Sequence, residues 1–486
     1  MSFRKDHYFF PLEKYILGIF LCSLLIYCVT LAPDVLWGDD AQYQRLANGW
    51  KMEFVPRGHI VYSYLVKSVN LFPFSNTALK VNFFSAFWAS LTLVFLFLIT
   101  LSISGSKFGG ILAVLVFSLS HTFWLHAVRA EVHTLQLFLI TFSLYLLIRW
   151  FKSENNKSLV FFSFLMIGIS LANHILSIAL LPAMFYLILQ KRDDRRIASC
   201  QAILGLLPGL TILLFLQTGS ESVFATLLNY LYIKRFHLIV PKNLFMFIAF
   251  FFYQFLLSSV IGFSGLRRLS VSDRKMFIFL NLIFLGNILE VIVLPIRDQY
   301  VLFLPAFLVF SIFIGLGFSY LVGRSGLITK ICLILLLLIL PVIIYRITPD
   351  ILSKMNINLL SIRTLQNRNN FKFFLFPPKN GYRGAGDFAR ETLEKLPQNS
   401  LIISDFTIAQ ALLYVQQIEN FRPDVMIKGL DDDQTFQDLI EQYGTNRIFI
   451  ADNNSYYPVE EIGRNYSIIP FRYVFRLDKI AVKQEL

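Results

Sequence analysis

Long apolar stretches dominate the first 350 residues of the chain, and each has about the length with which a helix crosses roughly 30 Å of hydrocarbon. Together they predict a polytopic α-helical membrane protein with about eleven transmembrane helices. No small-residue cleavage pattern follows the first stretch, so we expect it to remain as a span. The predicted spans are 15–32, 80–103, 108–124, 132–150, 158–173, 174–190, 197–217, 244–264, 276–295, 299–322 and 328–347.

The pattern changes at residue 386 to short apolar runs between amphipathic stretches. Helices predicted over 388–396, 408–418 and 436–443 alternate with strands predicted over 401–404, 425–428 and 447–451, and an apolar run follows over 473–482. Alternation of this kind is typical of a small α/β domain with a largely parallel sheet. The expected domains are a transmembrane domain with an outer loop at 33–79, a linker and an α/β domain, over 1–347, 348–385 and 386–486.

Basic residues fall in alternate loops, which the positive-inside rule makes cytoplasmic. They are Arg4, Lys5, Lys14, Arg149, Lys152, Lys157, Lys191, Arg192, Arg195, Arg196, Arg267, Arg268, Arg274 and Lys275. An odd number of spans then puts the C-terminal domain on the outer, extracytoplasmic face. The outer loop 33–79 mixes polar residues with apolar ones at helical spacing, which predicts short helices at the membrane surface.

Composition supports a membrane protein over a soluble one. Of the 486 residues 56% are hydrophobic and 15% are charged, against about 25% charged in soluble domains. The net charge of +13 comes from residues 1–349, with 28 Lys and Arg against 14 Asp and Glu, while 350–486 carry 16 against 17. This basic excess lies beside the spans, so it indicates topology and anionic lipids rather than nucleic acid. The four cysteines lie in apolar stretches and imply neither disulfides nor a zinc site.

Two adjacent carboxylates, Asp39 and Asp40, lie just beyond the first span. Desolvation at the rim of an apolar bundle raises the pKa of a carboxyl group and favours a proton-accepting role. In sugar transfer, such a base takes the acceptor's proton while the anomeric carbon is attacked and a phosphate leaves. The alternative is structural, with one of the two aspartates capping a short helix.

A second polar cluster lies at the outer junction of the third and fourth spans, and contains Arg129, Glu131 and His133. Ionisable side chains are costly within an apolar region, so the cluster indicates a functional patch. On a helix Arg129 and His133 would share a face at i,i+4 while Glu131 points elsewhere, which is not a zinc motif. Anchoring at the interface by Trp124 and the histidines is the alternative.

Two further positions carry candidate chemistry. Arg297 and Asp298 precede Tyr300 in a short outer turn, where the arginine either clamps a phosphate or closes the turn as an ion pair with its neighbour. Asp405 follows a predicted parallel strand, where open α/β sheets bind ligands. We favour the interpretation that Asp405 caps a helix; at most, it takes part in recognition of the acceptor.

The motifs resemble those of protein O-mannosyltransferase-like membrane proteins in the GT-C glycosyltransferase superfamily. The similarity is carried, in order, by Gly38-Asp39-Asp40-Ala41-Gln42, Val55-Pro56-Arg57-Gly58-His59, Phe123-Trp124 with Ala130-Glu131-Val132, Arg297-Asp298-Gln299-Tyr300 with Leu304-Pro305, and the segment 401–425. Two positions depart from the family pattern: Gln42 stands where the family has a glutamate, and Val55 where it has a histidine. Three explanations are open: Asp40 or Glu131 has taken over a role of the missing family residues, the acceptor differs, or activity is lost.

The resemblance implies an inverting transferase on the outer face that moves a sugar from a polyprenyl-phosphate donor to a protein, glycan or lipid acceptor. It implies Asp39, Asp40 and Glu131 as catalytic residues, no required cofactor, and compatibility with a divalent metal. The substrate-binding residues expected are Gln42, Arg57, His59, Arg129, His133, Arg297, Asp298 and Tyr300. The membrane expected is a bacterial inner membrane. The rival hypotheses are a lipid head-group transporter or flippase, and an inactive binding scaffold.

Overall fold

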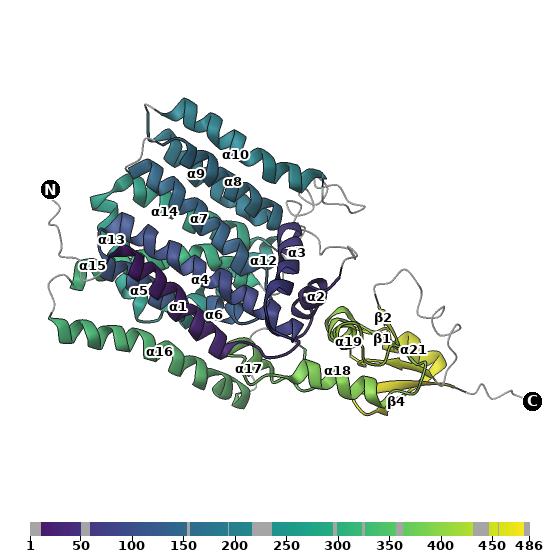
Figure 1. The fold of residues 1–486 in the computed structure, drawn as a ribbon. Helices are drawn as coiled ribbons and strands as arrows, with labels where there is room; N and C mark the ends of the chain where they lie inside the picture. Colours follow the sequence, from purple (N-terminus) through teal and green to yellow (C-terminus); the bar gives the residue numbers. More distant parts are fainter. Residues whose placement is uncertain are drawn as a thin grey trace, which may run out of the picture.

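The structure, a computed structural model, shows a bundle of helices that run side by side, with the C-terminal part of the chain (green to yellow) at one end (Figure 1). Helices α2 and α3 lie between the bundle and this C-terminal part. The residues described are 11–49, 59–152, 156–192, 194–215, 236–294, 299–322, 326–355, 363–430, 447–454 and 456–480.

Seven helices of the described chain are long and apolar enough to cross a membrane, and nine spans result if each of two bent helix pairs counts as one. The long helices are α1 (Leu12–Thr30), α4 (Thr77–Ser104), α7 (His133–Lys152), α10 (Arg195–Phe215), α14 (Arg274–Ile292), α15 (Leu304–Val322, preceded by the 3₁₀ helix η3, Gln299–Phe303) and α16 (Leu327–Lys354). The polytopic helical fold predicted from the sequence is confirmed.

The two bent pairs interrupt spans that the hydropathy pattern predicts as continuous. Helices α5 (Lys107–Ser118) and α6 (His121–Ala127) meet at 70°, and α12 (Phe236–Phe255) and α13 (Ser258–Ser272) meet at 102°. Hydropathy does not detect either bend because each break is only two residues long, Leu119-Ser120 and Leu256-Leu257, too short to interrupt a window of about 19 residues.

The two remaining predicted spans are shorter apolar helices. Helix α8 (Ser158–Asn173) reaches about 24 Å at 1.5 Å per residue, less than the thickness of the hydrocarbon. It ends at His174, whose extended backbone separates it from the 3₁₀ helix η2 (Ile175–Leu180) and from α9 (Leu181–Leu189).

The loops of the bundle segregate to its two ends. At one end the basic loops meet: Lys152 lies 4.0 Å from Asp273, and Lys157 lies 3.1 Å from Asp194. At the other end the backbone N–H of Ala32 donates to the carbonyl of Val128, so the start of the first outer loop meets the turn after α6 there. The short helices expected in the first outer loop are present as α2 (Asp39–Leu46), α3 (Ile60–Leu65) and the 3₁₀ helix η1 (Val66–Leu71).

Glycines let helices approach closely at two crossings in the bundle. A Cβ atom on Gly209 of α10 would lie 2.0 Å from the backbone of Gly168 in α8. A Cβ atom on Gly265 of α13 would lie 1.9 Å from the carbonyl oxygen of Phe313 in α15. Because apolar lipid provides no hydrophobic driving force between helices, such close backbone packing is a main source of their attraction.

The C-terminal part contains a five-stranded sheet of order β2-β1-β3-β5-β4. Strand β1 (Leu401–Ser404) pairs in parallel with β2 (Met426–Gly429) and β3 (Ile448–Ile450), whereas β5 (Val474–Lys479) pairs antiparallel with β3 and β4 (Tyr466–Phe471). The sheet is therefore mixed, which corrects the prediction of a largely parallel one. The helices are α17 (Asn370–Leu375), α18 (Gly384–Lys395), α19 (Phe406–Ile418) and α21 (Val459–Asn465), and the predicted helix 436–443 lies outside the described residues.

Strand β4 went unpredicted for a local reason. It forms a hairpin with β5 through Arg472 and Tyr473, and Arg472 adopts a φ of +56°. Two-residue hairpin turns normally place Gly, Asn or Asp in such a conformation, so the sequence carries no turn signal here. Pro470 inside the strand further weakens the pattern.

The core of the C-terminal part continues into the first outer loop. Trp37 packs against Phe388 of α18 with ring centroids 5.4 Å apart, and its indole N–H donates to the Tyr382 hydroxyl. Ala32, Val35, Leu36 and Ala41 are buried in the same apolar cluster as the sheet. The outer loop and the C-terminal part therefore fold as one packed unit.

Candidate functional site

Helix α2 begins at Gly38, which takes the N-cap position with a φ of +61°. The backbone N–H of Gly38 donates to the carbonyl of Thr407 in α19, 3.1 Å away. Asp39 and Asp40 follow in the first turn, where the helix dipole favours negative charge. Neither aspartate is the cap, so the alternative that one of them caps the helix is wrong.

The two aspartates have different surroundings. Asp39 is exposed, whereas Asp40 is completely buried. Successive residues on a helix diverge by about 100°, so the two carboxylates point to different sides of α2. Asp40 is thereby directed at the second cluster predicted from the sequence.

Arg129 joins Asp40 to Glu131. Its Nε lies 3.0 Å from Asp40 Oδ1 and its Nη2 lies 2.8 Å from Asp40 Oδ2, and the same Nη2 lies 2.7 Å from Glu131 Oε1. The backbone N–H of Glu131 donates to Ser85 of α4, which fixes the turn that carries it. Three residues predicted to be functional thus form one buried ion-pair network.

Burial and charge act in opposite directions at this network. Burial raises the pKa of Asp40 to about 6, although Arg129 lowers it. Burial lowers the pKa of Arg129, but the charges of Asp40 and Glu131 outweigh burial, so the net shift is upward. Arg129 therefore stays protonated, and Asp40 titrates close to neutral pH.

Lys379 is a fourth ionisable residue near this network, and sequence analysis missed it. The ammonium donates to the carbonyls of Phe376, Pro377 and Pro378, and the backbone N–H donates to Thr30 at the end of α1. Burial lowers the pKa of Lys379, Arg129 lowers it further, and Asp40 raises it. No local signal marks this lysine, because 339 positions separate it from Asp40.

Histidine rings extend from the network on the Glu131 side. Glu131 Oε2 lies 3.9 Å from His133 Nε2, and the His133 ring lies 5.8 Å from that of His174. The His174 ring lies 5.1 Å from that of His59, whose Nδ1 donates to the carbonyl of Asn173. Burial lowers the pKa of His59, so this ring is neutral at physiological pH.

A small cavity of about 30 Å³ lies beside His133 and His174. This volume suffices for about two water molecules by the usual measure. Polar and apolar side chains share its wall, and Leu304 and Pro305, the last residues of the fourth motif, belong to it. The other lining residues are Gln136, Leu137, Ile140, Leu176, Ser177, Asn287, Val301 and Leu302.

The remaining predicted residues are divided between the site and regions outside the described ranges. Tyr300 is buried, stacks on Phe250 with centroids 4.4 Å apart and lies 5.9 Å from the ring of His126. Gln42 is half-buried on α2. Arg57, Arg297 and Asp298 lie outside the described residues. Within the described ranges, no three His, Cys, Asp or Glu side chains are grouped so as to hold a metal ion. That the site is compatible with a divalent metal stays a prediction.

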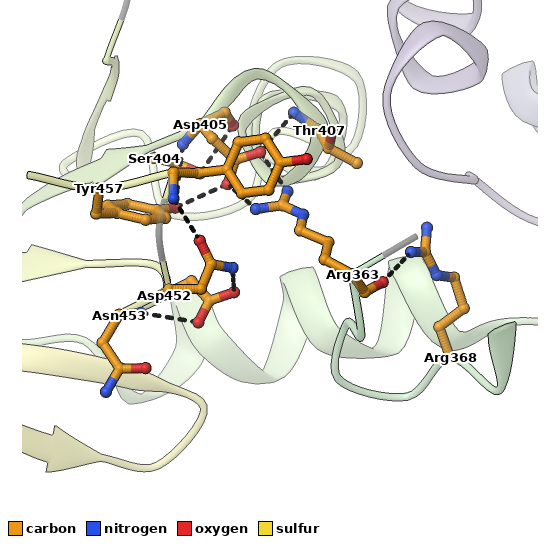
Figure 2. Close-up of polar contacts among 10 residues, drawn as sticks. Arg363, Arg368, Ser404, Asp405, Thr407, Asp452, Asn453 and Tyr457 are labelled. Atoms are coloured by element: carbon orange, nitrogen blue, oxygen red, sulfur yellow. Dashed lines mark hydrogen bonds and ion pairs between the residues drawn. The ribbon is translucent and has the colours of Figure 1, made fainter. Parts of the chain in front are cut away.

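Asp405 acts as a helix cap, as the favoured interpretation predicted. Its carboxylate accepts from the backbone N–H of Thr407 at 3.0 Å and from the Tyr457 hydroxyl at 2.8 Å. Arg363 pairs with the same carboxylate through both terminal nitrogens. Figure 2 shows these side chains converging where β1 ends, with Asp452 and Asn453 beyond β3. Both carboxylate oxygens of Asp405 are therefore held by these contacts with other residues of the C-terminal part.

Sequence comparison identifies relatives of part of the chain. Residues 50–197 match the family described as protein O-mannosyl-transferase TMEM260 N-terminal domain. The mouse (Mus musculus) protein O-mannosyl-transferase TMEM260 is 29% identical over 119 residues, which cover 24% of this chain and 17% of the mouse protein. The family match includes Arg129, Glu131 and His133 but begins after Asp39 and Asp40.

Solved structures share the fold over nearly the whole chain. ArnT from Cupriavidus metallidurans bound to undecaprenyl phosphate gives a TM-score of 0.60 at 9% identity, over 96% of this chain and 98% of ArnT. The oligosaccharyltransferase of Archaeoglobus fulgidus, in complex with Zn and sulfate, gives 0.52 at 11% identity over 84% of this chain and 62% of that one. These comparisons confirm the predicted resemblance: the chain is a polytopic membrane protein with the fold of the GT-C enzymes, and its residues 50–197 resemble the TMEM260 N-terminal domain.

Proposed function

We propose that this protein is an inverting membrane glycosyltransferase that uses a sugar linked to polyprenyl phosphate. The observation that carries the proposal is the buried network of Asp40, Arg129 and Glu131 beside the exposed Asp39, at one end of a GT-C-like bundle. A lipid-phosphate donor is supported by the undecaprenyl phosphate bound to ArnT, which shares the fold. The acceptor is a protein, a glycan or a lipid.

Asp39 is the proposed base. Both oxygens of Asp40 contact Arg129, whereas Asp39 is exposed and therefore accessible to an acceptor. Asp39 takes the proton of the acceptor hydroxyl while the acceptor oxygen bonds to the anomeric carbon. The bond from that carbon to the phosphate oxygen breaks, its electron pair stays on the phosphate, and the sugar is transferred with inversion.

Cationic side chains are proposed to bind the donor phosphate and stabilise its growing charge. Arg129 is the candidate within the described structure, and Arg297 is the candidate from the sequence motif. Lys379 lies close enough to Arg129 for their charges to interact, but its side-chain nitrogen is held by three backbone carbonyls. His133 and His174 are proposed to contact the sugar, because they continue the polar site on the Glu131 side.

The orientation follows from charge. The basic loops gather at the end of the bundle opposite to α2, so that end is assigned to the cytoplasm and the C-terminal part to the outer face. The proposed location is a bacterial inner membrane. This orientation exposes Asp39 to acceptors outside the cytoplasm.

The test is turnover of polyprenyl-phosphate sugars by the purified protein in lipid nanodiscs. A panel of donors with radiolabelled sugars is offered with and without candidate acceptors, in parallel with and without a metal chelator. Release of polyprenyl phosphate with transfer or hydrolysis of the sugar is expected for at least one donor, and Asp39→Asn should abolish it. Binding of a donor without turnover would favour an inactive scaffold, and movement of intact donor across a bilayer would favour a flippase.

A further inference from the structure

An ion triad connects the first outer loop to the C-terminal part. Arg390 of α18 donates to both oxygens of Asp34, at 2.8 and 3.0 Å, and to both oxygens of Glu419, at 2.9 and 2.6 Å. Glu419 is the C-cap residue of α19. Asp34 is 3% exposed and lies four residues before Gly38. Arg390 therefore compensates a buried negative charge close to the start of α2.

The contact between Asp34 and Arg390 depends on a glycine. A Cβ atom on Gly386 of α18 would lie 2.6 Å from Asp34 Oδ2 and 2.7 Å from Arg390 Nη1. A side chain here would require the carboxylate of Asp34 or the guanidinium of Arg390 to shift. Gly386 lies in the first turn of α18, where alanine would favour the helix more than glycine does, and the close packing against Asp34 and Arg390 is a reason for glycine here.

The C-terminal part also holds α2 at both of its ends. The N–H of Gly38 donates to the carbonyl of Thr407 in the first turn of α19. At the other end of α2, Arg45 donates to Gln417 at 3.0 Å and to Gln410 at 2.5 Å. Helix α2, which carries Asp39 and Asp40, is therefore attached along α19, and the ion triad secures the loop that leads into it.

We propose that Arg390 is a positioning residue, and that through Asp34 the C-terminal part fixes the placement of Asp39 and Asp40 in the active site. The proposal rests on the function proposed above. Arg390 touches neither aspartate of α2 in any hydrogen bond or ion pair of the described chain; it acts through the loop 34–38. Displacing reacting groups by about 1 Å costs up to roughly 10²-fold in rate, so loss of the triad should lower kcat.

The first test replaces Arg390 and measures kcat, the KM for the donor and the donor's equilibrium affinity. Arg390→Gln should lower kcat roughly 10- to 100-fold while donor affinity stays within about threefold, because Arg129, the proposed phosphate ligand, is held by Glu131 as well as by Asp40. Arg390→Lys should restore part of the kcat. Arg476→Gln is the matched control: Arg476 is 40% exposed against 35% for Arg390, and it pairs with Asp478 of its own strand. Its kcat should equal that of the wild type.

The second test leaves every charged residue in place and shifts the ion pair with a methyl group added at Gly386. Gly386→Ala should lower kcat as Arg390→Gln does, without loss of folded protein, because alanine favours the helix. Gly463→Ala in α21 is the control, since nothing lies within 4 Å of the added Cβ there. Unchanged kcat in both Arg390→Gln and Gly386→Ala would overturn the proposal, as would a loss of folded protein with normal kcat per active site.

The two proposals fail in different ways. If Asp39→Asn abolishes transfer while the Arg390 and Gly386 variants retain full kcat, the positioning role is wrong and the proposed function stands. If no donor is turned over by the wild type, the proposed function fails, and the positioning role of Arg390 in catalysis fails with it.

Discussion

The backbone N–H of Ala32 donates to the carbonyl oxygen of Val128 at 2.9 Å. This hydrogen bond joins the end of the first span to the turn after α6, and the residue that follows Val128 is Arg129. As a result Asp40 and Arg129, which are 89 positions apart in the sequence, form an ion pair. The two clusters of candidate residues that the sequence shows separately are thereby one site.

Arg129→Gln should destabilise the protein as well as inactivate it. The arginine compensates two buried carboxylates, and removing one partner of a buried ion pair typically costs 3–5 kcal/mol, so we expect a loss of about that size. Thermal unfolding in detergent measures the effect. Arg268→Gln is the control, because Arg268 is exposed at the opposite end of the bundle, and equal unfolding temperatures for the two variants would contradict the network.

Asp40 should make stability depend on pH. Its pKa is raised from 3.8 to about 6 by burial, so the folded state binds this proton more tightly than the unfolded state. The resulting stabilisation is present below about pH 4 and is lost as the pH rises through 6, by roughly 3 kcal/mol in total. The unfolding temperature of the wild type relative to that of Asp40→Asn should therefore fall between pH 4 and pH 7. A difference that stays constant or rises over this range would contradict the raised pKa.

The C-terminal part should be accessible from outside the cytoplasm. A cysteine placed at the exposed Asn453 should react with an impermeant thiol reagent in intact cells whose outer face is accessible. Ser272→Cys, at the end of α13 beside the basic loops, should react only after the cells are permeabilised. The reverse labelling would invert the topology and remove the proposed site from the outer face.

Asp405→Asn should leave donor turnover unchanged. Asparagine caps a helix about as well as aspartate, so α19 should keep its first turn, while the ion pair with Arg363 is lost. Asp405→Ala removes the cap as well and should cost a further 0.5–2 kcal/mol, about the usual value of a cap. Urea titration measures both. Loss of donor hydrolysis in Asp405→Asn, with the protein still folded, would move the active site into the C-terminal part.

The parts of this molecule that were predicted from sequence are those set by local patterns. Apolar runs predicted the bundle, and the ionisable side chains of Arg129, Glu131 and His133 inside an apolar region marked them as functional. The structure brings Arg129 and Glu131 together with Asp40. The distant contacts left no local signal: Lys379 beside the network and Arg390 on Asp34, 356 positions away, depend on how the C-terminal part packs. The bends after α5 and α12 were missed because each break is only two residues long between apolar helices.

The last prediction separates the two aspartates of α2. Asp39→Asn should reduce sugar transfer by about 10²- to 10⁴-fold, the usual effect of removing a positioned base, while donor binding is retained. Asp40→Asn should cost far less, because asparagine still hydrogen-bonds Arg129 and Glu131 still compensates its charge. Asp387→Asn, an exposed aspartate in the first turn of α18, is the control for loss of one negative charge. If Asp40→Asn abolished transfer and Asp39→Asn did not, the base would be the buried carboxylate, whose pKa of about 6 suits proton transfer near neutral pH.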